Sequence, residues 1–313
     1  MRFNFIKNTI LLFVLILLSC RNNSNSQTPD IKNRAPIILG AQQTESYLPI
    51  LKNKNIGIVA NQTSVIFKSE GYTHLVDSLL SLNINVKKVF APEHGFRGTA
   101  DAGEYVKDGI DAVSGIPIVS LYGVNKIPNS AILSDLDVVV FDVQDVGARF
   151  YTFLSTLHYM METCANLGIT VLVLDRPNPN GHYVDGPTLD LKYTSFVGIH
   201  PVPVVHGMTV GEYAQMINGE DWLKEGLKCD LKVISLQNYT HSTPYKLPIN
   251  PSPNLPNSKA INLYPSLCFF EGTNMSMGRG TENQFQVIGS PYLNGDLYNY
   301  EFEKEHFYDG IHT

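Results

Sequence analysis

The segment at residues 89–104, "VFAPEHGFRGTADAGE", carries five charged or titratable side chains directly after an apolar run. A solvated surface loop would account for this polarity, because loops collect polar residues and glycine. Glu93, however, has Phe90 and Phe96 as near neighbours, and apolar surroundings raise the pKa of a carboxyl group and keep it protonated. A protonated carboxyl group beside His94 is suited to general acid catalysis. The segment therefore predicts one wall of a polar crevice that can transfer a proton.

Polar residues also follow the other apolar, β-rich runs of the chain. In an open parallel sheet the carboxyl ends of the strands meet at one edge, and ligands bind there. Six runs of this kind bring six polar residues to one predicted rim: Asn61, Glu93, Tyr122, Asp142, Asp175 and His206. The adjoining motifs "DVQDVGARFYT" and "DRPNPNGHYVDGP" add Asp145, Arg149, Arg176 and Asn178. Strand ends that merely cap a sheet would explain one or two such residues, whereas six favour a shared ligand crevice.

Carboxylates mixed with arginines and aromatic residues are suited to binding and cleaving a sugar. Glycosidic cleavage needs a protonated acid at the leaving oxygen and usually a second carboxylate. Glu93 fits the first role, and the candidates for the second are Asp142, Asp145, Asp175 and Glu271. Arginines in the same crevice would bind an anionic group on the sugar through paired hydrogen bonds.

Two other functions stay open on the residues alone. His94, Asp142, Asp145 and His206 are of the right kind for a zinc or manganese site, which would make the protein a metal-dependent hydrolase. A non-catalytic binding protein needs arginines and aromatic residues but no acid in position for proton transfer, and a solvent-exposed Glu93 would favour it. The chain lacks both glycine-rich motifs that bind nucleotide phosphates, and no cofactor is implied.

Continuous apolar runs are typical of strands buried on both faces of a parallel sheet. The runs are "NIGIVA", "NVKKVFA", "IPIVSLY", "LDVVVFD", "ITVLVLD" and "PVPVVH", and helix-compatible segments separate most of them. This alternation predicts a doubly wound α/β domain with a mainly parallel sheet over residues 37–220. From residue 221 onward we expect a smaller second domain, with one more strand-like run and then a proline-rich stretch at 242–266 in which helices are not expected.

The N-terminal residues indicate export. Two basic residues precede an apolar run that ends at Cys20, which is typical of a lipoprotein signal peptide at 1–19, and a polar tether follows at 20–36. We expect a lipid on Cys20 that holds the protein to a membrane in the periplasm, with the outer membrane as the expected location. The formal net charge of −6 disfavours nucleic-acid binding. The remaining cysteines are expected to be free thiols: Cys164, Cys229 and Cys268.

Seven strings of the chain resemble, in order and spacing, the NamZ-type exo-β-N-acetylmuramidases over about residues 35–292. They are "APEHGFRGTADAGE", "VFDVQDVGARFYTF", "LDRPNPNGHYVDGP", "PVVHGMTVGEYAQMINGE", "PSPNLPN", "LYPSLCFFEGTN" and "GRGT". The resemblance implies a Rossmann-like domain, a smaller second α+β domain, and an active site between them. It also implies an exo-acting glycosidase of cell-wall turnover that releases N-acetylmuramic acid from the non-reducing end of peptidoglycan fragments such as MurNAc-GlcNAc.

On this resemblance, Glu93 falls on the glutamate expected to be catalytic, with His94 beside it. The other matched positions are expected to line the cleft: Arg97, Asp142, Asp145, Arg149, Tyr151, Asp175, Arg176, Asn178, His206, Glu271 and Arg279. We take Asp142 and Asp145 as further catalytic candidates and add Asn61 as a substrate-binding one. Relatives continue beyond the "GSP" motif, and Met277 stands where many of them carry a charged residue.

N-acetylmuramic acid differs from N-acetylglucosamine by a lactyl ether that bears one carboxylate, so a cation is expected to bind that group. We favour Arg97 or Arg279, because both lie in glycine-rich loops that let a ligand approach closely. Arg149 and Arg176 are expected to have nearby aspartates as alternative partners.

Overall fold

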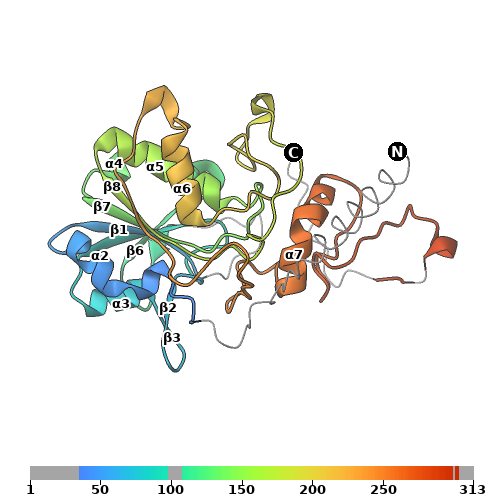
Figure 1. The fold of residues 1–313 in the computed structure, drawn as a ribbon, viewed down its shortest axis with the longest axis horizontal. Helices are drawn as coiled ribbons and strands as arrows, with labels where there is room; N and C mark the ends of the chain where they lie inside the picture. Colours follow the sequence, from blue (N-terminus) through green and yellow to red (C-terminus); the bar gives the residue numbers. More distant parts are fainter. Residues whose placement is uncertain (1–34, 98–107, 299, 303–313) are drawn as a thin grey trace, which may run out of the picture. The chain divides into compact units, whose positions relative to one another are not determined.

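The computed structural model describes residues 35–97, 108–298 and 300–302 (Figure 1). The predicted signal peptide, Cys20 and most of the predicted tether lie outside the described residues. None of the helices within these ranges combines the length and the apolar composition that a membrane crossing requires.

A seven-stranded sheet forms the centre of the fold, with strand order β5-β6-β4-β1-β7-β8-β9. All neighbouring strands in it are parallel except β5 and β6. The chain order reverses at β1, which has β4 on one side and β7 on the other, and this confirms the predicted doubly wound, mainly parallel α/β fold. The strands are β1 (Ile56–Ala60), β4 (Val86–Ala91), β5 (Gly109–Ile110), β6 (Pro117–Ser120), β7 (Val138–Asp142), β8 (Thr170–Leu174) and β9 (Leu231–Ile234), and β2 (Val65–Phe67) forms a separate hairpin with β3 (Tyr72–His74).

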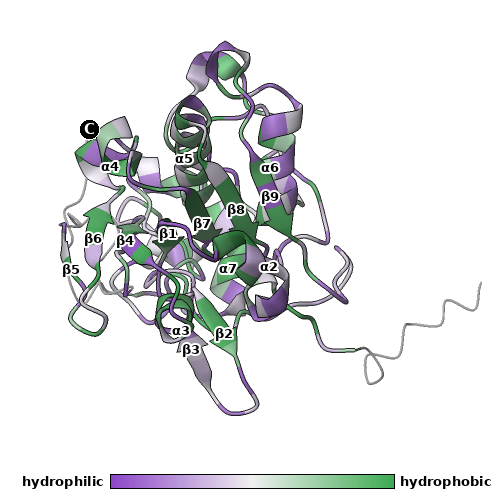
Figure 2. Ribbon diagram, turned by 90° about the vertical axis from the view of Figure 1, so that its left-hand side faces the viewer, coloured by the Kyte–Doolittle hydropathy of each residue, from purple (hydrophilic) through white to green (hydrophobic). Residues whose placement is uncertain are grey.

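Alternate side chains of each central strand enter two different cores, one on each face of the sheet. Val139 and Phe141 of β7 belong to the core that α5 and α6 cover, whereas Val138 and Val140 belong to the core that α2 and α3 cover. Figure 1 shows helices on both sides of the sheet, and the strands in Figure 2 are mostly hydrophobic. The helices are α2 (Thr44–Leu51), α3 (Leu75–Ser81), α4 (Ser130–Leu133), α5 (Phe153–Leu167), α6 (Val210–Gly219) and α7 (Ser258–Leu267).

Two helix ends follow their sequence signals. Helix α5 ends at Gly168, whose φ of 66° is the left-handed conformation that glycine adopts without strain. Helix α6 begins with a capping box, in which Thr209 Oγ1 accepts from the Glu212 N–H and Glu212 accepts from the Thr209 N–H. The cap at Thr209 starts α6 beside the carboxyl ends of β8 and β9.

The predicted strand "PVPVVH" at 201–206 is wrong. This run forms only isolated bridges, through Val205 with Ala148 and with Asp185. Pro201 and Pro203 have no N–H to donate, so the run cannot form a continuous ladder. The segment still lies at the carboxyl edge of the sheet, because the N–H of residue 206 donates to the carbonyl of Gly147 in the loop after β7 (3.3 Å).

The last strand of the sheet, β9, lies beyond residue 220, where the first domain was predicted to end. It pairs with β8 in parallel, with Val171 opposite Leu231. The sheet therefore draws part of its edge from the segment that we assigned to the second domain.

Helix α7 lies in the proline-rich stretch where no helix was expected, so that prediction is wrong. Asn257 caps the helix, since its side chain accepts from the Ala260 N–H (3.0 Å). Pro265 has no N–H and leaves the Ile261 carbonyl without its helical donor. Asn180 Nδ2 supplies the missing hydrogen bond at 3.1 Å. A side chain from the loop after β8 thus makes a proline inside this helix tolerable.

The three cysteines within the described ranges are free, as predicted. Cys164 and Cys229 are buried, and burial raises the pKa of the Cys229 thiol to about 12. A thiol with so high a pKa is a poor nucleophile, so these residues serve the core rather than chemistry.

Candidate active site

Glu93 stands in a tight turn directly after β4. The Gly95 N–H donates to the carbonyl of Pro92 (3.0 Å), and both His94 and Gly95 have left-handed backbones, with φ of 70° and 78°. This conformation is uncommon for a residue other than glycine and is found where the surrounding structure imposes it, often at functional sites. The side chain of His94 is buried, and that of Glu93 is half-buried. The exposed Glu93 that would favour a non-catalytic binding protein is therefore not what the structure shows.

Thr152 holds the Glu93 side chain in place. Its Oγ1 donates to Glu93 Oε2 at 2.8 Å. Because Thr152 is the N-cap residue of α5, this bond joins the loop after β4 to the loop after β7. One oxygen of the carboxyl group is thus fixed by a donor from a neighbouring loop.

Asp145 and His206 form a second polar pair at the same edge. Asp145 Oδ2 accepts from the Gly147 N–H (2.6 Å) and lies 3.5 Å from His206 Nε2. The Met208 N–H donates to His206 Nδ1 (3.2 Å), so a neutral imidazole carries its proton on Nε2, the nitrogen that faces Asp145. Both side chains are buried.

Tyr151 connects these groups. Its ring is buried and packs edge to face against Phe153 and Tyr264. Burial raises the pKa of its phenol well above the usual value, and the charges of Asp145 and Glu93 raise it further. A phenol that senses both carboxylates must lie near both, so Glu93, Tyr151 and Asp145 share one neighbourhood.

Three buried polar atoms in this neighbourhood have no hydrogen bond of normal geometry to any described residue. They are Asp145 Oδ1, Tyr151 Oη and His206 Nε2. Ser252 lies beside the Tyr151 hydroxyl but does not satisfy it. A buried polar group without a partner costs about 1–3 kcal/mol, so folded proteins retain few of them. These three atoms are therefore available for hydrogen bonds to a ligand.

Asp142, a predicted catalytic residue, is instead half of an internal ion pair. Its two oxygens accept from Arg176 Nε and Nη2, at 2.6 and 2.9 Å, and both side chains are buried. Arg176 Nη2 also lies 3.3 Å from the Val65 carbonyl. The contacts of Asp142 and Arg176 favour a structural role, since neither side chain has the exposed edge that a reacting sugar would need.

Asp175 holds the start of α6. Its carboxylate accepts from the Gly211 N–H (2.7 Å), from Thr209 Oγ1 (2.9 Å) and from the Arg176 N–H (2.9 Å). Burial raises the pKa of Asp175 to about 6 despite these donors. The guanidinium group of Arg176, the next residue, does not pair with Asp175, because it binds Asp142.

Asn61 and Asn178 brace loops at the same edge. Asn61 Oδ1 accepts from both the N–H and the Oγ1 of Thr63, which turns the chain after β1. Asn178 Nδ2 donates to the Met208 carbonyl and its Oδ1 accepts from the Asn180 N–H. These contacts fix the loops at this edge of the sheet, and the predicted substrate contacts of both residues stay predictions.

The two arginines that sequence favoured for the lactyl carboxylate both have acidic partners. Arg97 binds Asp111 through two hydrogen bonds, at 3.1 and 2.7 Å, and lies 3.5 Å from Asp77. Arg279 pairs with Glu271. Arg97 also borders a cavity of about 400 Å³ beside the β2–β3 hairpin. The preference for Arg97 or Arg279 therefore finds no support in their contacts.

Arg149 has the opposite environment to the one expected. Its Nη1 donates to the carbonyls of Pro187 (2.7 Å) and Val202 (2.6 Å). No carboxylate among the described residues pairs with it, so the expectation of a nearby aspartate partner is wrong. The reason is that Asp145, four residues away, turns back onto the Gly147 N–H and His206.

The metal-site alternative needs His94, Asp142, Asp145 and His206 to converge. Within the ranges that the structure describes, no group of three or more histidine, cysteine or acidic side chains is arranged to hold a metal ion. Asp142 in particular has both oxygens on Arg176. The site geometry favours acid–base chemistry by side chains.

Comparison with family models settles the family. Residues 56–259 match the N-terminal model of exo-β-N-acetylmuramidase NamZ, and residues 262–311 match the C-terminal model. The chain belongs to the NamZ family. The boundary between the two NamZ models falls near the start of α7, so the N-terminal model includes β9.

Individual relatives agree with this assignment. The chain is 39% identical over 279 residues to the peptidoglycan β-N-acetylmuramidase NamZ of Bacillus subtilis. The matched region covers 86% of this chain and 66% of the relative, so the chain spans just under two thirds of the length of that relative. A crystal structure of a DUF1343 family protein from Bacteroides fragilis is 51% identical to this chain and superposes with a TM-score of 0.77. The match covers 86% of this chain and 71% of the chain in that structure. A second DUF1343 structure from the same organism is 31% identical, with a TM-score of 0.73, and the match covers 83% of this chain and 67% of the other.

The structure adds residues to the NamZ site that sequence reasoning did not single out. Thr152 binds Glu93, Asn180 links the loops after β7 and β8 to α7, and Ser252 lies beside Tyr151. All three stand inside strings that carried the resemblance, so their presence in those strings was the available signal. Nothing in the strings indicated which partner each would contact.

We expect Gly147→Ala to destabilise the protein by about 1–3 kcal/mol, because its φ of 80° is strained for alanine and a Cβ there would lie 2.3 Å from Asn178 Oδ1. The same turn positions Asp145, so turnover should fall as well. Gly219→Ala is the matched control: nothing lies within 4 Å of its added Cβ at the end of α6, and it should be neutral or slightly stabilising. Urea unfolding curves compare the two, and equal midpoints would contradict this reading of the turn.

Proposed function

We propose that this protein is an exo-acting glycosidase that releases N-acetylmuramic acid from the non-reducing end of peptidoglycan fragments. Membership of the NamZ family supports the proposal, as does the 39% identity to a relative named as a peptidoglycan β-N-acetylmuramidase. The observation that carries it is the grouping of Glu93, Tyr151 and Asp145 with three unsatisfied polar atoms at the carboxyl edge of the sheet. A half-buried acid beside a second carboxylate is what glycosidic cleavage requires.

In this proposal Glu93 is the general acid. Thr152 donates to Oε2, which leaves Oε1 as the oxygen from which a proton would be transferred. Transfer of this proton to the glycosidic oxygen, as its bond to the anomeric carbon breaks, would release the leaving sugar as an alcohol. The Glu93 carboxylate left behind can take a proton back from the water that completes hydrolysis.

Asp145 is the proposed second carboxylate. The Gly147 N–H and the proton on His206 Nε2 both face Oδ2, which fixes the orientation of the carboxylate. The other oxygen, Oδ1, is the one without a partner. A negative oxygen held in a buried place stabilises the positive charge that develops on the sugar ring in the transition state.

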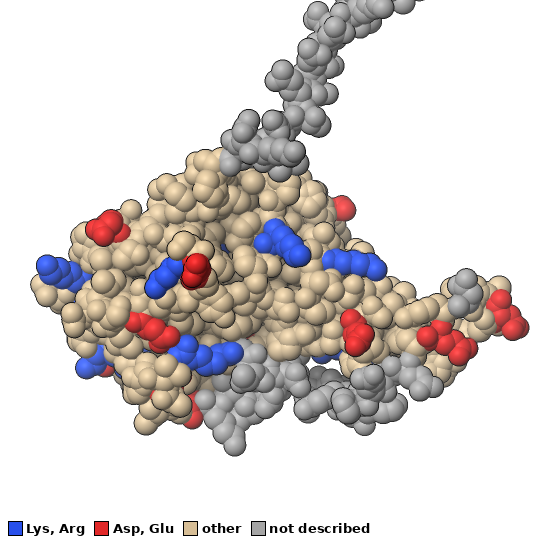
Figure 3. Space-filling view, turned by 90° about the horizontal axis from the view of Figure 1, so that it is seen from below, with Lys and Arg blue, Asp and Glu red and all other residues tan. Residues whose placement is uncertain are grey.

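The surface charge is consistent with a sugar ligand. On the face seen in Figure 3, basic and acidic side chains are interspersed rather than sorted by sign. A ligand recognised at one anionic group needs a single well-placed cation, not a basic surface.

We expect Glu93→Gln to lower the turnover of a chromogenic β-MurNAc glycoside by about two to four orders of magnitude, because the amide keeps the shape and the Thr152 contact but has no proton of suitable acidity. Glu70→Gln is the matched control, since Glu70 is exposed in the β2–β3 turn. Circular dichroism should show both variants folded. Turnover by Glu93→Gln at the rate of the control would remove Glu93 from the proposed role.

We also propose that the protein is an exported lipoprotein, held to the outer membrane by a lipid on Cys20. The support is the N-terminal sequence pattern of basic residues, apolar run and cysteine. Cys20→Ala should shift the protein from the membrane to the soluble fraction or leave it unprocessed, whereas Cys268→Ala should not. A processed Cys20→Ala protein that still sediments with membranes would refute the anchor.

A further inference from the structure

The arginines of the family strings differ in one respect that matters for an anionic ligand. Arg97, Arg176 and Arg279 each form an ion pair with an acidic side chain. Arg149 forms none with any described residue, although burial lowers the pKa of its guanidinium group. Desolvating a charge without a counter-ion is unfavourable, so an arginine in this state gains most from an anionic ligand.

The guanidinium group of Arg149 is held by one end only. Nη1 uses its two protons on the carbonyls of Pro187 and Val202. The remaining donors, on Nε and Nη2, make no hydrogen bond to any described residue. These two nitrogens form the edge of the guanidinium fork that matches the two oxygens of a carboxylate. The carbonyls therefore orient the group and leave a carboxylate-binding edge free.

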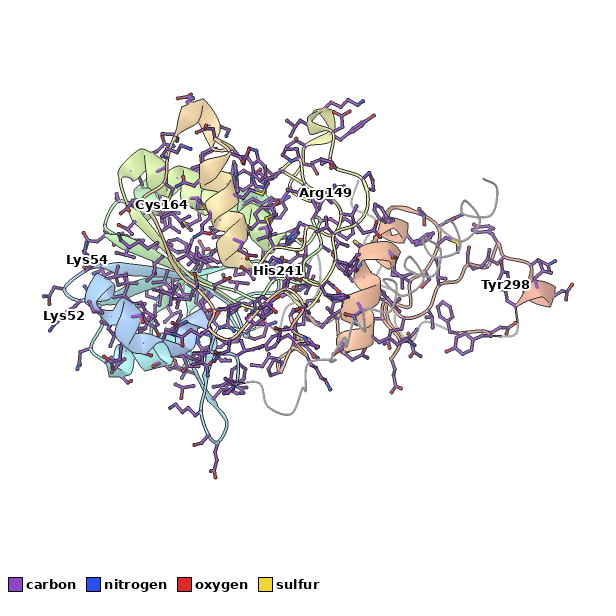
Figure 4. The ribbon with its side chains drawn as sticks, viewed as in Figure 1. Lys52, Lys54, Arg149, Cys164, His241 and Tyr298 are labelled. Atoms are coloured by element: carbon purple, nitrogen blue, oxygen red, sulfur yellow. The ribbon has the colours of Figure 1, made fainter. Side chains whose placement is uncertain are left out.

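The backbone around Arg149 fixes its position further. Its N–H donates to the Val204 carbonyl (2.8 Å), and the chain turns directly afterwards, where the Tyr151 N–H donates to the Ala148 carbonyl (2.9 Å). In Figure 4, Arg149 lies among the loops rather than on a helix that covers the sheet. Such bracing limits the freedom that a long side chain would lose on binding a ligand.

The backbone of Arg149 is close to the residue that holds the proposed acid. Three peptide units separate it from Thr152, the residue that binds Glu93, so the two Cα atoms lie at most about 11 Å apart. The phenol of Tyr213 interacts electrostatically with both Arg149 and Asp145, which places all three side chains on one side of the fold. The lactyl group of N-acetylmuramic acid is attached at O3, on the carbon two bonds along the ring from the anomeric carbon. The residue that binds the lactyl carboxylate must therefore reach the same sugar as the acid, which the short chain distance between Arg149 and Thr152 allows.

We propose that the free edge of Arg149 binds the lactyl carboxylate of N-acetylmuramic acid and so selects this sugar over N-acetylglucosamine. The inference rests on the proposed function and names the residue that gives it specificity. It replaces Arg97 and Arg279, whose guanidinium groups are already neutralised. The residue reads one substituent of the substrate and takes no part in proton transfer.

The direct test compares two chromogenic glycosides that differ only in the lactyl ether, β-MurNAc and β-GlcNAc. Arg149→Met removes the charge and keeps much of the bulk. We expect it to lower kcat/KM for the MurNAc glycoside by about ten- to a hundredfold, the usual range for a charge-assisted contact, and to leave the GlcNAc glycoside within about threefold. Arg149→Lys keeps the charge without the fork and should retain part of the preference.

Lys126→Met is the matched control. Lys126 also loses a positive charge in this change and also contacts the loop that Arg149 braces, through the ring of Phe196 (4.5 Å). The preference of the Lys126→Met variant between the two glycosides should equal that of the wild type. If Arg149→Met lowers the rates on both glycosides equally, Arg149 is only a brace for the loop and the inference is wrong. An unchanged preference in Arg149→Met overturns it as well.

A binding measurement separates this inference from the proposed function. Calorimetry would compare free N-acetylmuramic acid with its neutral lactyl amide, on wild type and on Arg149→Lys, which keeps donors for the two carbonyls should the methionine variant not fold. Wild type should bind the acid at least about tenfold more tightly than the amide, and Arg149→Lys should lose most of that difference. If this holds while no glycoside is hydrolysed, the inference stands and the proposed function fails. If the wild type cleaves β-MurNAc but binds acid and amide equally, the function stands and the inference fails.

Discussion

The buried ion pair between Asp142 and Arg176 holds the carboxyl edge of the sheet together. It joins the end of β7 to the residues after β8, and Arg176 reaches on to the Val65 carbonyl in the β2–β3 hairpin. Removing one partner of such a pair typically costs about 3–5 kcal/mol, because the other charge stays buried alone. The loops that carry Glu93, Asp145 and Tyr151 therefore rest on an edge that is fixed before any ligand binds.

Polar side chains extend this frame outward. Ser64 Oγ donates to the Asp142 carbonyl, and the Gln144 N–H donates to Thr63 Oγ1, which ties the loop after β1 to the loop after β7. Asn180 links the loop after β8 to the carbonyls of Val146 and Ile261. Irregular loops that approach a cleft must satisfy their backbone groups in this way. Asp145, Tyr151 and His206 each keep one unsatisfied atom within this frame, as do Asn61 and Asn180.

The sequence predicted the sheet better than the contacts at its edge. Runs such as "LDVVVFD" and "ITVLVLD" are apolar on both faces, and only a strand buried on both sides needs that composition. The run "PVPVVH" has the same apolarity, but its prolines cannot donate to a ladder. Helix α7 was missed because a proline inside a helix is tolerated only when another group binds the freed carbonyl, and here that group is Asn180, from a distant part of the chain.

The pairing of charges could not be read from sequence for a similar reason. Strand topology places Asp142, Asp145, Arg149 and Arg176 at one edge, but which carboxylate meets which guanidinium depends on side-chain directions that the sequence does not encode locally. Asp145 stands nearer to Arg149 in the chain, yet it turns to Gly147 and His206, while Asp142 takes Arg176 from 34 residues away. That Arg149 has no acidic partner among the described residues followed only from the full set of contacts.

A crystal structure of the Glu93→Gln variant with a bound MurNAc-GlcNAc disaccharide tests the central claim most directly, namely that the sugar is cleaved at the edge formed by Glu93, Tyr151 and Asp145. The account predicts the side chain of residue 93 at about 3 Å from the glycosidic oxygen, with Asp145 Oδ1 and Tyr151 Oη both in contact with the terminal sugar. A disaccharide bound instead in the cavity beside Arg97, with those two atoms still unpartnered, would contradict it.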